Sequence, residues 1–221
     1  MEQKILSWFG NSSISPDLMG INFIGDSVRW DYSNYCIELN SKATGSNYVH
    51  FQSDVKQSSF RYRVSVSYYA ADGNNWGDGL AIGCMCNSTP IKDRLSAWAL
   101  HYGGYSGFDG AYTTYFNEKK QEDTEAGQLT FFSNGGYINS SIGVGEVNTG
   151  IHSQLIFEGI SDENGMQCTI SNNDGKLING VCGISKSQIT EPFGGRFFFI
   201  NGINKTYNIV RRIHSIELWS S

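Results

Sequence analysis

The nine residues Phe60–Tyr68 constrain the fold more than any other segment of this chain. Their sequence is FRYRVSVSY, in which every even position is apolar or aromatic and every odd position is polar. A period of two is typical of an antiparallel strand that buries one face, whereas a helix repeats every 3.6 residues. No segment of the chain has a helical period longer than two turns, so the sequence predicts an all-β protein.

Several other segments show strand patterns between glycine, asparagine or serine breaks. Gln167–Ser171 alternates in the same way, and Asn172–Gly175 follows it with an Asp-Gly hairpin turn. Further strands are expected over 22–31, 35–39, 47–52, 78–86, 95–101, 111–117, 127–133, 152–159, 176–181, 195–201 and 208–219. A dozen or so short strands predict one domain spanning residues 1–221, built as two antiparallel sheets of about six strands each.

The two ends of the chain are expected to pair with each other. Ile5, Leu6, Trp8 and Phe9 are apolar enough to form an edge strand, although the first twenty residues have a weaker pattern. Ile213–Trp219 would be a suitable partner for that strand in one sheet.

Charge and hydropathy exclude several classes of function. The formal net charge is -5 and no basic run occurs, so binding to nucleic-acid phosphates is not expected. No apolar run has the length of a membrane span, so membrane insertion is not expected. The first ten residues lack the apolar core of a signal peptide. These features favour a cytoplasmic or virion-associated protein over a classically secreted one.

The five cysteines, Cys36, Cys84, Cys86, Cys168 and Cys182, do not form a metal-binding pattern. An odd number leaves at least one thiol unpaired, and no second cysteine pair or nearby histidine completes a set of four zinc ligands. Buried free thiols are therefore expected, as in a reducing compartment or a virion assembled in the cytoplasm.

The order of five motifs, of which the alternating segment Phe60–Tyr68 is the first, gives the chain a family resemblance. Gly77–Ile82 contains an Asp-Gly-Leu-Ala sequence, and Tyr102–Phe108 contains a double glycine. Gly195–Gly202 and His214–Leu218 follow later in the chain. This order resembles the legume-type, concanavalin A-like (L-type) lectins. The resemblance implies a jelly-roll β-sandwich, and a carbohydrate site where separated loops meet at one end of the sandwich.

The resemblance also implies roles for individual residues. Asp78 would accept hydrogen bonds from two sugar hydroxyls, because a carboxylate forms strong charge-assisted bonds. Gly103 and Gly104 would let a backbone N–H approach the sugar, and Asn117 would add an amide. Tyr and Trp side chains would pack on the sugar ring. The candidate carbohydrate-binding residues are Trp76, Asp78, Gly79, Gly103, Gly104, Tyr105, Asn117, Gly202, Asn204 and Tyr207.

The metal ligands of the resembled family do not recur here. That family holds calcium and a transition metal through acids on the strand matching 111–117, where Thr114 and Phe116 stand in this chain. Gln128 stands near the position of the family's histidine. Calcium needs six to eight oxygen ligands. No metal or other cofactor is therefore expected. Four acids occur in the following loop, Glu118, Glu122, Asp123 and Glu125. We interpret them as a solvated charge run, and calcium binding by these acids is the alternative.

Two enzymatic activities found in such sandwiches have residue requirements that can be compared with this sequence. A glycosidase needs two carboxylates flanking the sugar bond, and no Glu-x-Asp-x-Glu arrangement occurs. The residues available for polysaccharide lyase chemistry are Arg61, Arg63, His101, Tyr102 and Tyr112. The pattern instead predicts that the two arginines lie on the solvent-exposed face of a strand. The sequence therefore favours a non-enzymatic module whose partner is a glycan. The alternative is a structural or assembly subunit, such as a virion or fibre decoration protein, and homo-oligomerisation stays open.

Overall fold

The computed structural model describes residues 2–11, 13–25, 27–40, 47–55, 60–70, 79–85, 112–117, 129–133, 136–140, 154–172, 182–185, 187, 195–203 and 209–220. Within these residues the strands are β1 (Gln3–Phe9), β2 (Ile21–Ile24), β3 (Val28–Asp31), β4 (Cys36–Asn40), β5 (Asn47–Val55), β6 (Phe60–Ala70), β7 (Gly79–Met85), β8 (Tyr112–Asn117), β9 (Leu129–Ser133), β10 (Gly136–Ser140), β11 (Gln154–Asp162), β12 (Gly165–Asn172), β13 (Cys182–Ser185), β14 (Gly195–Ile203) and β15 (Ile209–Ser220).

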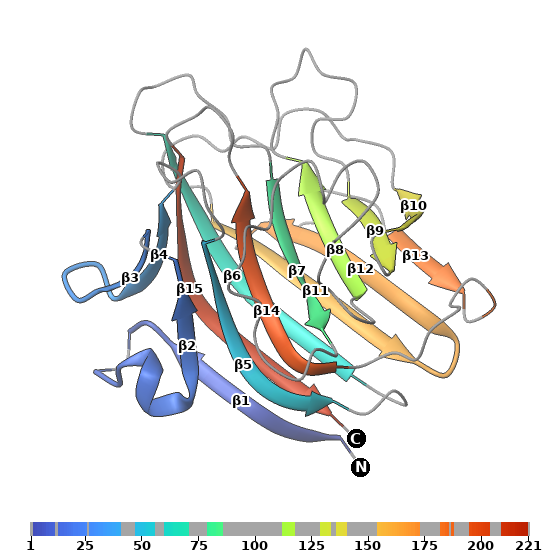
Figure 1. The fold of residues 1–221 in the computed structure, drawn as a ribbon, viewed down its shortest axis with the longest axis horizontal. Coiled ribbons are helices and arrows are strands. Elements are labelled where there is room, and N and C mark those ends of the chain that lie inside the picture. Colours follow the sequence, from blue (N-terminus) through green and yellow to red (C-terminus); the bar gives the residue numbers. More distant parts are fainter. Residues whose placement is uncertain are drawn as a thin grey trace.

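The strands form two antiparallel sheets that pack face to face (Figure 1). The eight-stranded sheet has the order β13-β12-β11-β6-β15-β4-β3, and β1 also pairs with β15. The seven-stranded sheet has the order β10-β9-β8-β7-β14-β5-β2. The predicted all-β sandwich is therefore confirmed, with more strands in each sheet than the six expected.

The alternating segment lies at the centre of the eight-stranded sheet, where β6 pairs with β11 on one side and β15 on the other. Phe60, Tyr62, Val64 and Val66 are buried in the core. The arginines between them lie on the outer face and are half-buried. The period of two therefore predicted the correct face for the described side chains from Phe60 to Ser67.

The two chain ends pair as predicted. β1 runs antiparallel to the last part of β15, with Trp8 opposite Ile216. The N- and C-termini lie side by side in Figure 1. Pro16–Met19 forms a short 3-10 turn. Within the described residues, no helix is long and apolar enough to cross a membrane.

Some predicted elements differ from the structure or lie beyond its described part. The single strand expected over 22–31 is two strands, β2 and β3, which belong to different sheets. The chain breaks at Gly25, whose φ of 102° favours glycine. β10 was not expected at all. The strands expected at 95–101 and 176–181, and the turn at 173–175, lie outside the described residues.

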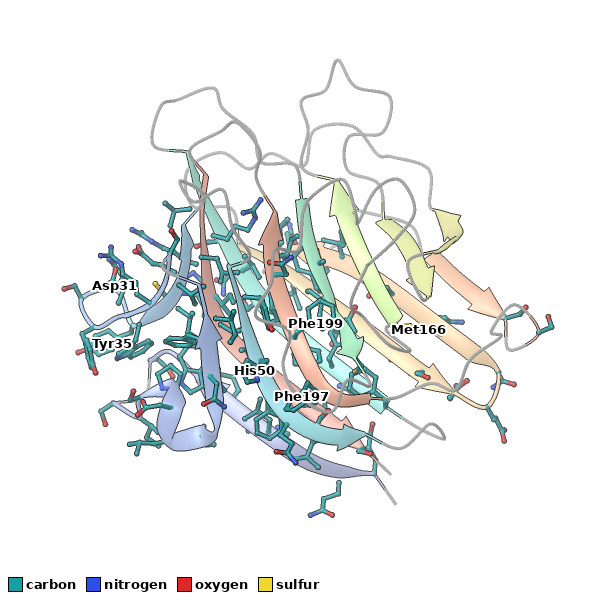
Figure 2. All side chains as sticks on the ribbon, viewed as in Figure 1. Asp31, Tyr35, His50, Met166, Phe197 and Phe199 are labelled. Carbon is teal, nitrogen blue, oxygen red and sulfur yellow. The ribbon has the colours of Figure 1, made fainter. Side chains whose placement is uncertain are left out.

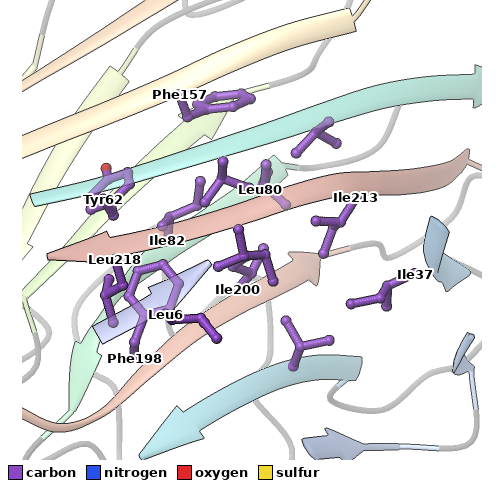
Figure 3. Close-up of a cluster of buried hydrophobic side chains, with 14 of the residues drawn as sticks. Leu6, Ile37, Tyr62, Leu80, Ile82, Phe157, Phe198, Ile200, Ile213 and Leu218 are labelled. Carbon is purple, nitrogen blue, oxygen red and sulfur yellow. The ribbon is translucent and has the colours of Figure 1, made fainter. Parts of the chain in front are cut away.

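The core fills the space between the sheets (Figure 3). Phe198 of β14 is 2% exposed and reaches across to β6, with its ring centroid 6.2 Å from that of Phe60 and 5.7 Å from that of Tyr62. These contacts join the seven-stranded sheet to the eight-stranded one.

Three of the five cysteines support the expectation of free thiols. Cys36, Cys84 and Cys168 are buried and form no disulfide. Burial raises the pKa of the Cys36 thiol to about 12, so this group stays protonated and unreactive at neutral pH. The side chains of Cys86 and Cys182 lie outside the described part of the structure.

Candidate functional site

Three of the predicted site residues lie on adjacent strands at one end of the seven-stranded sheet. Gly79 begins β7 and is paired with Asn117, the last residue of β8. On its other side, Gly79 is paired with Ile203, the last residue of β14, next to Gly202. This end is at the top of Figure 1. Asn117 and Ile203, which are 38 and 124 residues further along the chain than Gly79, are therefore its neighbours in space, and we call this region the loop end.

The other predicted site residues fall outside the described part of the chain. Trp76 and Asp78 precede β7, with Asp78 bonded directly to Gly79, and Asn204 and Tyr207 follow β14. Gly103, Gly104 and Tyr105 also lie outside, and the roles of all these residues stay predictions.

Gly202 has a packing role in the structure. A Cβ built on it would lie 2.8 Å from Nη1 of Arg211 and 3.5 Å from Cβ of Leu39, both in the eight-stranded sheet. Arg211 is only 1% exposed. The missing side chain of Gly202 therefore gives room to a buried guanidinium between the sheets, and only its backbone is left to contribute to the loop end.

The outer face of the seven-stranded sheet is a second packed layer that sequence reasoning missed. Tyr48, His50, Phe197 and Phe199 point away from the main core and are all buried. Their rings contact one another at centroid distances from 5.7 to 6.5 Å (Figure 2). The signal was available in β14, where the four consecutive residues Phe197–Ile200 are all aromatic or aliphatic, as in strands that are buried on both faces.

Asn201 follows these rings toward the loop end. It lies opposite Ala81 on one side and Tyr48 on the other, two residues before the end of β14. Its side chain is 1% exposed, and within the described residues neither amide atom has a hydrogen-bond partner. Leaving such a group unpaired costs about 1–3 kcal/mol, and native structures do so rarely. Asn201 is therefore a buried polar group beside the candidate site, and sequence analysis did not select it.

His50 makes the stability of this layer depend on pH. Burial lowers the pKa of its imidazole below the usual 6.5, so the ring is neutral in the folded protein. Below pH 6.5 the unfolded chain binds a proton there that the folded chain does not, so stability falls as the pH drops. We therefore expect the melting temperature to fall when the pH is lowered from about 7.5 to about 5.5, that is, from about one unit above to about one unit below the usual histidine pKa.

His50→Phe isolates the contribution of this residue. The variant keeps a ring against Phe197 but removes the titrating group, so its melting temperature should depend less on pH than that of the unaltered chain. His214 also has a lowered pKa, from burial and then from the charge of Arg212, so part of the slope should remain. An unchanged slope in His50→Phe would contradict this assignment.

The donor set of β8 does not fit the calcium site that the resemblance implies. None of its six residues, YTTYFN, is an acid, and Thr114 and Phe116 pair with Ile82 and Leu80 of β7. Calcium sites depend on carboxylates for most of their affinity. β8 therefore supplies no acidic ligand to the loop end.

A cluster of side chains that could bind a metal ion lies elsewhere, on the outer face of the eight-stranded sheet. Asp31, Cys36 and Glu38 each place a potential ligand atom within 4.8 Å of the others. Glu38 already accepts from Arg29 at 2.7 Å and from Arg212 at 3.1 Å, one on each carboxylate oxygen. Two arginines fill the positions that a cation would occupy, so this cluster is an ion-pair network joining β3, β4 and β15.

The residues considered for lyase chemistry are not brought together. Arg61 and Arg63 lie on β6 of the eight-stranded sheet, whereas Tyr112 lies on β8 of the seven-stranded sheet. Arg61 packs over the ring of Trp219 at 4.4 Å, and Arg63 lies 3.7 Å from Glu158. His101 and Tyr102 fall outside the described residues. The described members therefore form no common site.

The two sheets, their strand order and the loop end define a protein with the fold of the L-type lectins. Solved structures show the same arrangement over the whole chain. Peanut lectin with a nine-residue peptide is 15% identical, with a TM-score of 0.72, covering 100% of this chain and 98% of that one. A metal-free form of lectin I-B4 from Griffonia simplicifolia is 12% identical, with a TM-score of 0.71 and coverage of 98% and 100%.

A further solved structure has the same fold. The exoplasmic/lumenal domain of VIP36, in a form bound to Ca²⁺ and Man2, is 13% identical, with a TM-score of 0.67, covering 98% of this chain and 88% of that one. No protein-family model matches the sequence. No curated protein matches it either. At these identities the likeness concerns the fold, and function must be argued from the site.

Proposed function

We propose that this protein is a non-enzymatic glycan-binding module that holds its ligand at the loop end of the seven-stranded sheet. The observation that carries the proposal is the meeting of Gly79, Asn117 and Gly202 on three adjacent strand ends. These strands attach directly to the segments that contain Asp78 and Asn204. The fold is that of proteins called lectins, and one neighbour is described as bound to Man2.

The chemistry of this end suits a neutral sugar. Asp78 would accept from two hydroxyls, Gly104 would donate a backbone N–H, and Asn117 could do either through its amide. Trp76, Tyr105 and Tyr207 would cover the apolar face of the ring. Gly79, Gly103 and Asn204 would belong to the segments that surround the bound sugar. Such shallow sites are weak singly, so useful affinity would come from several copies bound together.

Binding is proposed to be independent of calcium. The support is the absence of acids from β8, the strand that carries them in the resembled family. A metal-free form of the Griffonia lectin has a similar fold, and this likeness supports the proposal. The chain would then support its loop end by packing alone, including the ring layer of Tyr48 and Phe199.

Asp78→Ala tests the proposed site. Loss of two charge-assisted hydrogen bonds, each worth about 1.5–3 kcal/mol, should weaken binding by at least about a hundredfold. The measurement is biolayer interferometry against an immobilised glycan to which the unaltered chain binds. Asp162→Ala is the matched control, because Asp162 is an exposed acid in the hairpin between β11 and β12 and should leave affinity unchanged.

The outcomes separate the glycan-binding role from the assembly role. Equal affinity of Asp78→Ala and the unaltered chain would exclude the loop end as the binding site. A folded, multimerised sample that binds no glycan would instead favour a structural subunit of a virion or fibre.

A further inference from the structure

A groove of about 720 Å³ opens on the outer face of the eight-stranded sheet, on the opposite side of the sandwich from the sheet that carries the loop end. Its floor is formed by β11, β6 and β15, and its wall by Phe9 at the end of β1 and by Asn34 and Tyr35 of the turn between β3 and β4. Its volume is in the range of small-molecule sites, which is about 300–1,000 Å³.

The floor presents two neighbouring hydroxyls, of Ser65 and Ser215, with the amide of Gln154 beside them. Ile156, Ser65 and Ser215 are paired side by side across β11, β6 and β15, and Phe9 continues the row on β1. Nε2 of Gln154 donates to Oγ of Ser65, and Oγ of Ser67 lies 2.7 Å from Nε2 of His214 in the next row. These groups can both donate to and accept from a ligand that carries hydroxyls.

The charges at one end of the groove are balanced. Arg63 lies between Glu158 and Glu217 in register. Nε of Arg63 is 3.7 Å from Glu158, and Lys4 lies 2.7 Å from Glu217. Two positive and two negative groups leave no excess charge, so the groove does not select an anion or a cation.

The wall holds an aromatic ring in a strained backbone position. Tyr35 has a φ of 49°, and it is the only non-glycine residue with positive φ in the described part of the chain. Its carbonyl oxygen occupies the space that a side chain on Gly10 would fill, and Gly10 N donates to His214 O at 2.7 Å. Strain of this kind, about 1–3 kcal/mol, concentrates at ligand clamps.

Both aromatic side chains of the wall remain accessible. Tyr35 is 52% exposed and Phe9 is 42% exposed. Rings beside a floor of hydroxyls and amides match the two sides of a sugar, whose C–H face packs on a ring while its hydroxyls form hydrogen bonds. A protein interface is a poorer match, since charged residues are depleted from the centres of such interfaces and this floor carries Arg63 and Glu217.

We propose that this groove is a second carbohydrate site, which binds a short neutral oligosaccharide on the outer face of the eight-stranded sheet. Tyr35 and Phe9 stack on the sugar, and Ser65, Ser215 and Gln154 bind its hydroxyls. The inference is independent of the function proposed for the loop end, because it uses no residue of the seven-stranded sheet.

The test is a ¹⁵N NMR titration of the full chain with lactose, cellobiose and N,N′-diacetylchitobiose, each at millimolar concentration. We expect saturable shifts of the amide signals of Ser65 and Ser215 and of the Gln154 side chain with at least one disaccharide. Tyr35→Ala should weaken that binding roughly tenfold. Tyr32→Ala is the matched control, because Tyr32 is in the same turn and 70% exposed but does not line the groove.

Asp78→Ala distinguishes the two proposed sites. Shifts at the groove should persist in that variant, so loss of loop-end binding alone would leave this inference intact. The inference is overturned if no probe shifts the groove signals, or if Tyr35→Ala and Tyr32→Ala bind equally. It is also overturned if the same signals shift on dilution without sugar, since a second copy of the chain would then be the occupant.

Discussion

Phe198→Ala is expected to lower the free energy of unfolding by about 3–5 kcal/mol, as for other buried aromatic residues replaced by alanine. Phe198 is 2% exposed and packs on Phe60 and Tyr62 of the opposite sheet. Its removal leaves a cavity where the two sheets are joined, and the rigid strands around it cannot collapse to fill the space. Urea unfolding followed by tryptophan fluorescence measures the change.

Phe9→Ala is the matched control for this prediction. It removes the same ring from the same protein, but Phe9 is 42% exposed and loses little buried area. Its effect should be below about 1 kcal/mol, in line with surface substitutions. Equal losses in the two variants would show that the sandwich is not joined through Phe198.

Gly159→Ala is expected to cost about 3 kcal/mol, at the upper end for overpacked sites. Gly159 of β11 lies opposite Tyr62 of β6, and a Cβ on it would be 2.1 Å from Cε1 of the tyrosine ring. Tyr62 is fully buried and its hydroxyl lies 3.3 Å from Sγ of Cys168, so the ring has no space to move aside. The same urea unfolding experiment gives the magnitude.

A double-mutant cycle separates this clash from other effects of the alanine. In a Tyr62→Ala background the ring is absent, so adding Gly159→Ala should cost far less than it does in the unaltered chain. Ile160→Ala, at a 46% exposed neighbour, should be nearly neutral. Strictly additive effects of Gly159→Ala and Tyr62→Ala would contradict contact between these residues.

Local periodicity accounts for much of what the sequence predicted about the fold. The alternation in Phe60–Tyr68 reports directly which side chains face the core, and β6 places them accordingly. The pairing of β1 with β15 was predicted from the apolar residues at both ends of the chain and from the frequent side-by-side placement of the termini in sandwiches of this kind. The prediction of a single strand over 22–31 was wrong because it also relied on local pattern. Apolar residues continue on both sides of Gly25, so the pattern does not reveal that the chain changes sheet there.

The candidate sites depend on strand register, which no local pattern contains. The order of motifs predicted that Gly79, Asn117 and Gly202 would be neighbours, and β8, β7 and β14 do place them together. Sequence reasoning missed the packing of Gly202 against Arg211, because these residues come from opposite sheets.

The groove was missed for the same reason. Its residues come from four strands and two turns, and they carry no motif. Ser65 appeared only as a polar position on the wet face of a strand. Its place between Ile156 and Ser215 exists only once three strands are in register.

Two sites on opposite sheets would allow one molecule to bind a glycan surface at two places. One molecule could then contact two chains of a polysaccharide, or two branches of one glycan, and gain affinity without any new contact. The gain depends on geometry, so it should appear on dense glycan surfaces and be absent with a single disaccharide in solution.

The measurement that tests the central claim most directly is a glycan array probed with the multimerised, unaltered protein, in calcium and in chelator. We predict binding to a defined subset of glycans, with equal intensity in the two conditions, because β8 offers no carboxylate to a metal. Signals lost in chelator would contradict metal independence. The absence of any retained glycan, from protein whose unfolding transition is intact, would contradict the lectin function itself.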